Sequence, residues 1–458
     1  MFKRISAYQP IYFLIGIILL LIPAFFNHFP FVYSDTGTYL TSGFGLILPE
    51  ERPIFYGIFA CLSSLYLSSW FIIAVQAGIT FFLIVELLNL FLSDRRLALK
   101  LSCLIAGFVS IFSSAGIFSD LLLPDIFSAY LILSVAIIFI GEHKGFRKFL
   151  LYFIAFISLC VHVSNLYSLI VILILCFFMY LFNRKRTELS FVKTFSKKFF
   201  CLSGLLLFVF VSLSLVNLRS FKVFSPNASS HVFVIARYCE SGLLKYMLEE
   251  EEKQGRIYSL TAFKDRLPST AQGFIWQEDS PFKKCGGWQN SKIEFNKLIN
   301  LSFSNMGYLK ENVIQIFKGS IQQLYTFNST KELFAYGKDL PPYKALEKYL
   351  PLDKSSFLTA KQNKGIIYDH WISKLHLVVA IISSFVCLVF LFFSKDQVKN
   401  KLLLLVLVFG IISNAIICGG FANVVDRLQA RVIWIIPLFT AIFITSEIVK
   451  RLNNKVKS

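Results

Sequence analysis

Three short polar segments, each lying between long apolar stretches, hold carboxylates and guanidinium groups that could do chemistry. Polar groups this close to hydrocarbon are costly and usually have a function. The carboxylates come from the first two segments, and the guanidinium groups come mainly from the last. In chain order, the side chains are Asp35 and Arg52, then Asp120 and Asp125, and finally Arg427 and Arg431.

These two kinds of side chain suit the transfer of a group from an anionic lipid carrier. A carboxylate can take the proton from an attacking hydroxyl group, which accelerates a reaction about 10²–10⁴-fold. An arginine can hold a leaving phosphate through two parallel hydrogen bonds. Arg427 and Arg431 are four residues apart, so on a helix both would face the same way. The carrier's lipid tail would lie between helices, with its phosphate at the level of these residues.

Each acidic residue also has a purely structural interpretation. Aspartate is a favoured N-cap, so Asp35 can cap a helix that begins at Thr36, and Asp125 can cap the helix that follows it. Asp120 can simply be solvated. The sequence leaves these alternatives open.

The arginines and one histidine can likewise have structural roles instead of functional ones. Arg52 can anchor an interface helix to lipid headgroups, and Arg431 can extend to the headgroups along its apolar stem. Arg427 can pair with a nearby carboxylate. His162 lies in a tight polar turn between two apolar stretches, where it can contact a substrate or only complete the turn.

Composition decides the class of protein that must position these groups. The chain has 458 residues, of which 56% are hydrophobic and only 16% are charged. A soluble domain has too little interior to hide that much apolar surface, so lipid is the expected solvent. The net charge of +19 would suggest nucleic acid in a soluble protein. Here the Lys and Arg residues cluster in short gaps between apolar stretches, so we expect no nucleic-acid partner.

The apolar stretches predict a polytopic α-helical membrane protein with about ten transmembrane helices. Several run for 17 or more residues without a charge, enough to cross about 30 Å of hydrocarbon. The first has no small-residue cleavage site after it, which favours an uncleaved span over a signal peptide. The predicted spans are 11–26, 70–92, 101–118, 126–140, 149–163, 167–182, 199–218, 375–393, 402–417 and 432–448.

Charge asymmetry between the gaps predicts the orientation. Alternate gaps are rich in Lys and Arg, whereas the short gaps between them hold only Arg52, Arg427 and Arg431. Basic gaps remain in the cytoplasm. We therefore expect a multi-pass protein of a bacterial inner membrane, with both termini cytoplasmic and the three polar segments on the outer face.

The spans divide the chain into three predicted regions. Residues 1–218 form an N-terminal transmembrane module, 219–371 a mostly helical extracytoplasmic domain, and 372–458 the C-terminal transmembrane helices. Within the outer domain, 308–327 has the apolar spacing of an amphipathic helix. An oxidising compartment would permit a disulfide between Cys239 and Cys285, which spacing alone cannot establish.

Residues 53–69 are apolar but join the next span without a charged turn. Two full crossings would need a hairpin, and the sequence supplies none. We expect a helix lying in the outer interface, with Pro53 near its start. A re-entrant segment is the alternative.

Several of these segments resemble a known group, the GT-C class of membrane glycosyltransferases, which use polyprenyl-phosphate sugars. The resemblance rests on "YSDTGTY" from Tyr33, "RPIFY" from Arg52 and "PDIFSAY" from Pro124, together with the overall topology. A large outer domain after the seventh span is also similar to the protein O-mannosyltransferase branch.

The resemblance implies roles for individual residues. An acid in the first outer loop is the catalytic base of that class, which would be Asp35, and a second-loop acid would correspond to Asp120 or Asp125. The chain departs from the usual pattern in having one acid in "SDTG" rather than an adjacent acidic pair. That departure leaves the use of a divalent metal open. Candidate substrate-binding residues are Tyr33, Arg52, Asp120, Asp125, His162, Arg427 and Arg431.

Three hypotheses therefore compete. The leading one is a glycosyltransferase that moves a sugar from a polyprenyl-phosphate donor to an extracytoplasmic acceptor. The second is a transporter or flippase of lipid-linked glycans, which needs polar groups near the middle of the membrane. The third is a non-catalytic membrane scaffold with an outer binding domain.

Overall fold

The computed structural model describes residues 8–183, 189–367, 371–393 and 398–457. These residues form helices joined by turns, with no β-strand among them beyond one isolated bridge between Phe31 and Leu121. The first half of the chain contains α1 (Tyr8–Leu20), α2 (Ile22–Asn27), α3 (Thr36–Gly45), α4 (Phe55–Ser63), α5 (Ser69–Leu88), α6 (Arg95–Phe112), α7 (Ala115–Ser119), α8 (Ile126–Ile140), α9 (Gly145–Val161), α10 (Val163–Asn183) and α11 (Leu189–Phe221).

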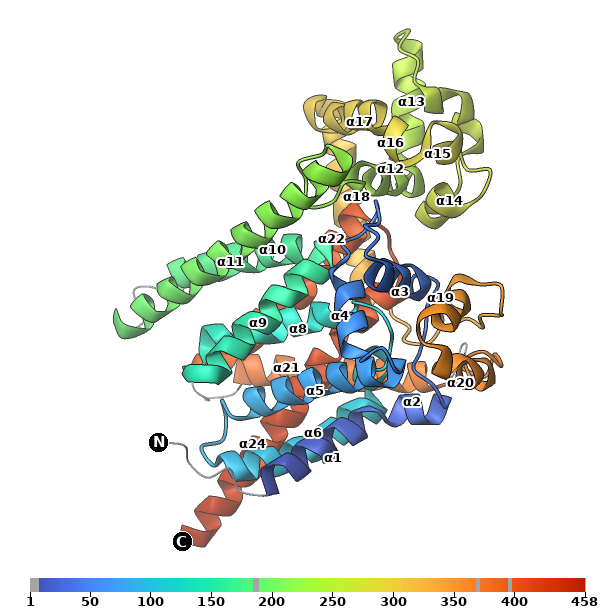
Figure 1. The fold of residues 1–458 in the computed structure, drawn as a ribbon. Helices are drawn as coiled ribbons and strands as arrows, with labels where there is room; N and C mark the ends of the chain where they lie inside the picture. The colour runs from blue at the N-terminus through green and yellow to red at the C-terminus, as the bar shows by residue number, and fades with distance from the viewer. Residues whose placement is uncertain (1–7, 184–188, 368–370, 394–397, 458) are drawn as a thin grey trace.

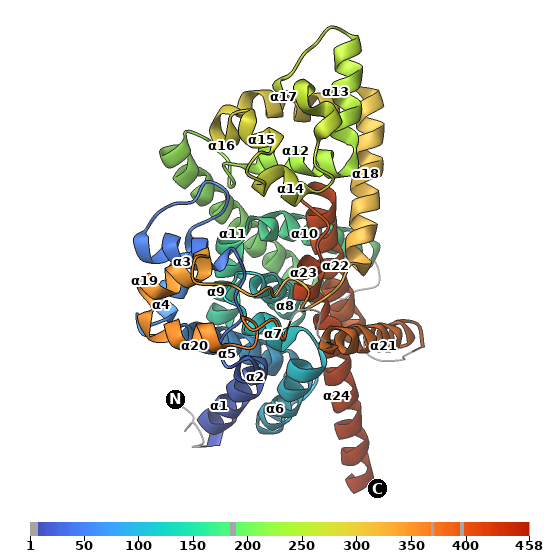
Figure 2. The same cartoon turned by 90° about the vertical axis from the view of Figure 1, so that its right-hand side faces the viewer.

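The second half begins with a group of short helices and ends with long ones (Figures 1 and 2). It contains α12 (Ser230–Ser241), α13 (Leu243–Lys253), η1 (Ser259–Arg266), α14 (Ala271–Trp276), α15 (Pro281–Lys284), α16 (Gly287–Asn290), α17 (Lys292–Ser304), α18 (Met306–Tyr325), α19 (Pro341–Tyr349), η2 (Pro351–Asp353), α20 (Lys354–Thr359), α21 (Ile372–Phe393), α22 (Val398–Phe421), α23 (Asp426–Ile433) and α24 (Ile435–Lys457).

Six helices of the described chain are long and apolar enough to cross a membrane. They are Ser69–Leu88, Val163–Leu181, Phe195–Phe221, Ile372–Phe392, Val398–Phe421 and Asp426–Lys455, and they cover six of the ten predicted spans. The helical membrane class therefore agrees with the structure, whereas a count of ten spans is not established by it.

The remaining four predicted spans correspond to shorter or more charged helices. The first is divided between α1 and α2 at Leu21, just before Pro23. The third corresponds to α6, whose first turns carry Arg95, Arg96 and Lys100. The fourth is α8, in which every residue is buried by protein. A helix that is apolar all round belongs in the interior, so α8 is the central helix of the bundle.

Residues 230–308 have a hydrophobic core of their own. It is built from α12, α13, α14, α15 and α17, with Phe274, Phe282 and Phe295 among its buried side chains. This group stands apart from the long helices at the upper end of the molecule in Figure 2. It is joined to them by α18, which packs along α22.

Residues 333–367 pack differently, because their apolar side chains belong to the main core. Leu346 and Phe357 are fully buried in it, and α19 packs against α3. Asp353 accepts hydrogen bonds of 2.6 Å from Ser68 Oγ and from the backbone N–H of Ser69, at the start of α5. The predicted outer domain thus contains one part with its own core and a second part folded onto the first outer loop.

The amphipathic helix predicted over 308–327 is present as α18. Its apolar residues Val313, Phe317 and Ile321 are exposed, and the buried side holds Gly319 and Gln323. Polar and small residues are buried there because α18 approaches α22 at its glycines. Cys239 and Cys285 are both free thiols, so the structure contains no disulfide between them.

The segment predicted to lie in the interface contains the short helix α4. Figure 1 shows α4 running across the direction of α5 instead of continuing it. The two helices are separated by a turn in which Leu65 and Tyr66 adopt positive φ, with exposed apolar side chains on either side. This arrangement accommodates an interface helix, and it positions Arg52 directly before α4.

Candidate functional site

Backbone pairing brings the first two predicted segments together. The N–H of Phe31 donates to the carbonyl of Asp120, and the N–H of Leu122 donates to the carbonyl of Phe31, both at 2.9 Å. Thr36 Oγ1 also donates to the carbonyl of Leu122 at 3.1 Å. These bonds fix the residues that lead into α3 beside those that lead into α8.

Asp35 begins α3, but its side chain does not cap the helix. Its Oδ2 instead lies 3.1 Å from Nη1 of Arg52, and 29% of the Asp35 side chain remains exposed. The Arg52 guanidinium lies 5.0 Å from the ring centroid of Tyr39 and also pairs with Glu51 at 3.3 Å. The structural alternative of an N-cap therefore does not hold for Asp35.

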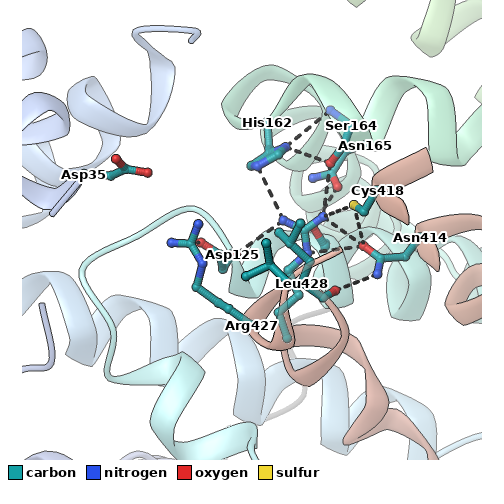
Figure 3. A network of polar contacts seen from close by, with 12 residues as sticks. Asp35, Asp125, His162, Ser164, Asn165, Asn414, Cys418, Arg427 and Leu428 are labelled. Carbon is teal, nitrogen blue, oxygen red and sulfur yellow. Dashed lines mark hydrogen bonds and ion pairs between the residues drawn. The ribbon is translucent and has the colours of Figure 1, made fainter. Parts of the chain in front are cut away.

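A second, buried group of polar side chains contains Asp125, Ser164 and Asn414 (Figure 3). Arg431 contacts all three. The side chain has no exposed surface, and Nη1 lies 3.3 Å from Oδ1 of Asp125. Nη2 donates to Asn414 Oδ1 at 2.8 Å and to Ser164 Oγ at 3.2 Å. Because its donors are engaged by protein, Arg431 acts as a positioning residue that links α8, α10, α22 and α23.

His162 completes this group at the junction of α9 and α10. Its Nε2 lies 3.4 Å from Nη1 of Arg431, and its Nδ1 lies 2.7 Å from Ser164 Oγ. These contacts join the α9–α10 junction to Arg431.

Arg427 lies on the opposite side of Asp125 from Arg431. It lies within ion-pair distance of two carboxylates, with Nη1 at 3.6 Å from Oδ2 of Asp125 and Nε at 3.7 Å from Oε2 of Glu332. Its Cζ also lies 4.0 Å from the ring centroid of Tyr33. Nε and Nη1 are buried and have no hydrogen-bond partner within the described part of the chain. Buried donors without partners are rare in proteins and call for an explanation such as a missing ligand.

Glu332 is a member of the site that sequence reasoning missed. It accepts a 3.0 Å hydrogen bond from the Tyr33 hydroxyl and faces Arg427. Burial raises the pKa of Glu332 above its usual range, although Arg427 opposes that shift. No sequence signal pointed to it, because it is one of many acids in residues 219–371 and lies far from the first polar segment along the chain.

The two groups adjoin each other. Tyr33 and Asp35 leave the same turn, and Asp35 is close enough to act electrostatically on Arg427. Figure 3 shows the Asp35 carboxylate on the side toward which the Arg427 guanidinium extends. The structure thus brings together seven of the eight predicted residues, namely Tyr33, Asp35, Arg52, Asp125, His162, Arg427 and Arg431. Their roles with a substrate stay a prediction.

Asp120 is the exception, because its side chain points away from this group. It is fully buried, and its Oδ2 accepts a 2.8 Å hydrogen bond from the backbone N–H of Ala24 in the first turn of α2. Burial raises the pKa of Asp120 well above its usual range. The solvated alternative is therefore wrong, and Asp120 stabilises the packing of α2 against the second outer segment.

The acids of the site differ in their electrostatic environment. Burial opposes ionisation of Asp125, but Arg427 and Arg431 outweigh it and hold the pKa of Asp125 below its usual range. A carboxylate stabilised in this way is a weak base. Asp125 is suited to holding the two arginines, whereas Asp35 is the more exposed carboxylate, at 29% against 5%.

Among the described residues, no three His, Cys, Asp or Glu side chains are arranged to hold a metal ion. The acids of the site contact arginines instead. A small pocket of about 10 Å³ adjoins Arg52, between residues 48–55 and Leu213 and Val216 of α11. That volume is about enough for one water molecule, so a larger ligand would require the loop to move.

Comparisons with known protein families, curated proteins and solved structures give no match for this chain.

Proposed function

We propose that the chain is a membrane glycosyltransferase that moves a sugar from a polyprenyl-phosphate donor to an acceptor outside the cytoplasm. The observation that supports this most directly is the guanidinium of Arg427, with two buried nitrogens that lack hydrogen-bond partners. A phosphate oxygen is a suitable acceptor for such donors. The neighbouring Asp35 provides a carboxylate that is partly exposed to an incoming acceptor.

The proposed step is a displacement at the anomeric carbon. Asp35 takes the proton from the acceptor hydroxyl, whose oxygen forms a bond to the anomeric carbon. The bond from that carbon to the donor phosphate breaks, and polyprenyl phosphate leaves with the electron pair. Arg427 stabilises the charge that develops on the leaving phosphate, which is where preorganised donors contribute most. No part of this step is assigned to a metal.

The contacts of Arg431 and Arg52 explain why neither is assigned to binding the donor phosphate. Arg431 is saturated by Asp125, Asn414 and Ser164, so it has little capacity to bind a substrate. Arg52 pairs with Asp35 and orients its carboxylate. The proposal includes the predicted orientation, with this site at the outer face of a bacterial inner membrane and both termini in the cytoplasm.

The packing of α5 favours a transferase over a transporter. Gln76 and Thr80 lie near the middle of α5, but both are buried and hydrogen-bonded to protein, Gln76 to the carbonyls of Ser119 and Leu121 and Thr80 to the hydroxyl of Tyr130. Glu86 lies near the C-terminal end of the helix, where it pairs with Arg147. Between Thr80 and Glu86, the buried side chains of α5 are the apolar Phe81, Leu83 and Ile84. The two polar groups on α5 are therefore separated by packed hydrocarbon.

The test is transfer of labelled sugar from a polyprenyl-phosphate donor by purified protein carrying Asp35→Asn. We expect transfer to fall at least about 100-fold, because the substitution removes the base but keeps the shape of the side chain. Asp279→Asn is the matched control, since Asp279 is exposed in the outer part of the chain and contacts none of the site residues. Full activity of folded Asp35→Asn would exclude Asp35 as the base.

A second variant separates the two acids that could act as base. Glu332→Gln should keep most of the transfer activity, because Glu332 is oriented by Tyr33 and Arg427 and is less exposed than Asp35. If Glu332→Gln abolishes transfer while Asp35→Asn does not, Glu332 is the base. If neither donor binding nor transfer is detected with any polyprenyl-phosphate sugar, the proposed function is wrong.

A further inference from the structure

A basic pocket lies at the opposite end of the bundle from the outer site. It is formed between α8, α9 and α11, close to the α8–α9 connection, which lies at the same end of the bundle as the start of α1 (Figure 1). This is the end that the charge pattern predicts to be cytoplasmic. The pocket measures about 350 Å³ and is lined by Ile138, Gly141, Glu142, His143, Lys144, Lys148, Leu151, Tyr152, Lys197, Lys198 and Cys201.

One of its four lysines is part of the framework. Nζ of Lys198 donates to the carbonyls of Phe139 and Gly141, at 3.2 and 2.6 Å, at the C-terminal end of α8. These are carbonyls that a helix end leaves without intrahelical partners. Lys198 therefore connects α11 to α8 and fixes one side of the pocket.

The other three lysines have no carboxylate within ion-pair distance in the described part of the chain. Lys148 lies 5.9 Å from the ring centroid of Tyr152, and Lys144 and Lys197 also line the opening. Glu86, the nearest acid on α5, is already held by Arg147 at 2.8 and 2.5 Å and by His143 at 3.4 Å. Glu142 is the one acid that lines this pocket, so positive charge is in excess there.

The walls of the pocket are apolar where they continue into the bundle. Ile138, Leu151 and the ring of Tyr152 lie beside the lysines, and Cys201 on α11 is exposed. Basic pockets between transmembrane helices on the cytoplasmic side are typical sites for anionic lipid headgroups. A soluble anion would contact only the charged half of this pocket, whereas a lipid would also contact the apolar half.

We propose that this pocket binds the phosphate headgroup of an anionic membrane lipid. The phosphate would lie among Lys144, Lys148 and Lys197, and the first carbons of the acyl chains would lie against Leu151 and Tyr152. This inference does not depend on the transfer reaction at the outer face, because it rests on different residues at the other end of the bundle.

The experiment measures lipid retention by the purified full-length protein using native mass spectrometry. The probes are phosphatidylglycerol, zwitterionic phosphatidylcholine and inorganic phosphate. We expect the unsubstituted protein to retain phosphatidylglycerol. The variant Lys144→Gln, Lys148→Gln, Lys197→Gln should bind it about 100-fold more weakly, since each lysine near an anionic surface contributes about fivefold.

A matched control removes three cations elsewhere on the same side. Arg95→Gln, Arg96→Gln, Lys100→Gln changes the same number of charges on exposed side chains of α6 and should leave phosphatidylglycerol binding unchanged. Equal loss in both triple variants would overturn the proposal, because binding would then follow surface charge alone.

Two further outcomes also count against a lipid site. Equal retention of phosphatidylcholine would show that the lysines are not used, and displacement of the lipid by millimolar inorganic phosphate would indicate a site for a free anion. If the triple variant does not fold, the single charge reversal Lys197→Glu on an exposed side chain gives the same comparison. Unchanged phosphatidylglycerol binding by that variant would contradict the proposal.

Discussion

At the scale of single residues, the two arginines of α23 are alike in sequence and different in their surroundings. They are one helical turn apart, and both contact Asp125. Arg431 has hydrogen-bond acceptors on three other elements. The buried Nε and Nη1 of Arg427 lie within ion-pair distance of Glu332 and Asp125 but make no hydrogen bond within the described part of the chain. The spacing correctly placed them on one side of a helix, but only their neighbours distinguish a positioning residue from a candidate ligand-binding residue.

Substitution by lysine should separate the two roles, because lysine keeps the charge but loses the planar guanidinium fork. Arg431→Lys should destabilise the protein by about 1–3 kcal/mol, since it leaves buried acceptors unpaired. Arg427→Lys should leave the Tm nearly unchanged and raise the KM for the lipid donor about tenfold or more. Thermal unfolding in detergent and donor titration measure the two effects, and the reverse pattern would exchange the roles.

At the scale of helices, α18 and α22 show how packing selects the face of a helix that is buried. The apolar spacing correctly predicted an amphipathic helix, and the face that α18 buries in the structure is the one that carries Gly319. A Cβ added at Gly419 would lie 2.2 Å from the carbonyl oxygen of Gly319, so the two backbones approach closely there. Gln323 reinforces this contact by exchanging hydrogen bonds with the backbone of Val425, at 2.9 and 3.0 Å.

This contact predicts a strong effect for a single methyl group. Gly419→Ala should lower stability by about 1–3 kcal/mol, because the helices must separate to accommodate it. Gly204→Ala is the matched control, since a Cβ at that position on α11 meets nothing within 4 Å. Alanine in an open helix position should leave the Tm unchanged or slightly higher. A normal Tm for Gly419→Ala would show that the close approach is not required.

At the scale of the whole molecule, the fold places the anion-binding candidates at one end of the bundle and the lysine-rich connections at the other. The charge pattern predicts that the lysine-rich end faces the cytoplasm. Two sets of hydrogen bonds bring distant segments together at one end of the bundle. Phe31 pairs with the backbone of Asp120 and Leu122. Asp353 accepts a hydrogen bond from the backbone N–H of Ser69 at the start of α5.

Cysteine labelling in intact cells tests this orientation. Gln254→Cys, in the exposed turn after α13, should react with a membrane-impermeant maleimide. Asn454→Cys, near the end of α24, should react only after the membrane is permeabilised. The unsubstituted protein, with its native thiols, provides the background signal. Labelling of both positions in intact cells, or of Asn454→Cys alone, would contradict the predicted orientation.

The sequence by itself determined the membrane class, most of the long helices and the polar segments that flank them. These follow from local composition, because a long apolar stretch requires lipid or a buried position wherever it lies. Contacts between distant segments are not encoded in that way. Only the tertiary structure decided that Glu332 joins Tyr33 and Arg427, that Asp120 points away to Ala24, and that α18 buries its glycine face. Each depends on which backbones approach closely, and spacing along one segment carries no information about that.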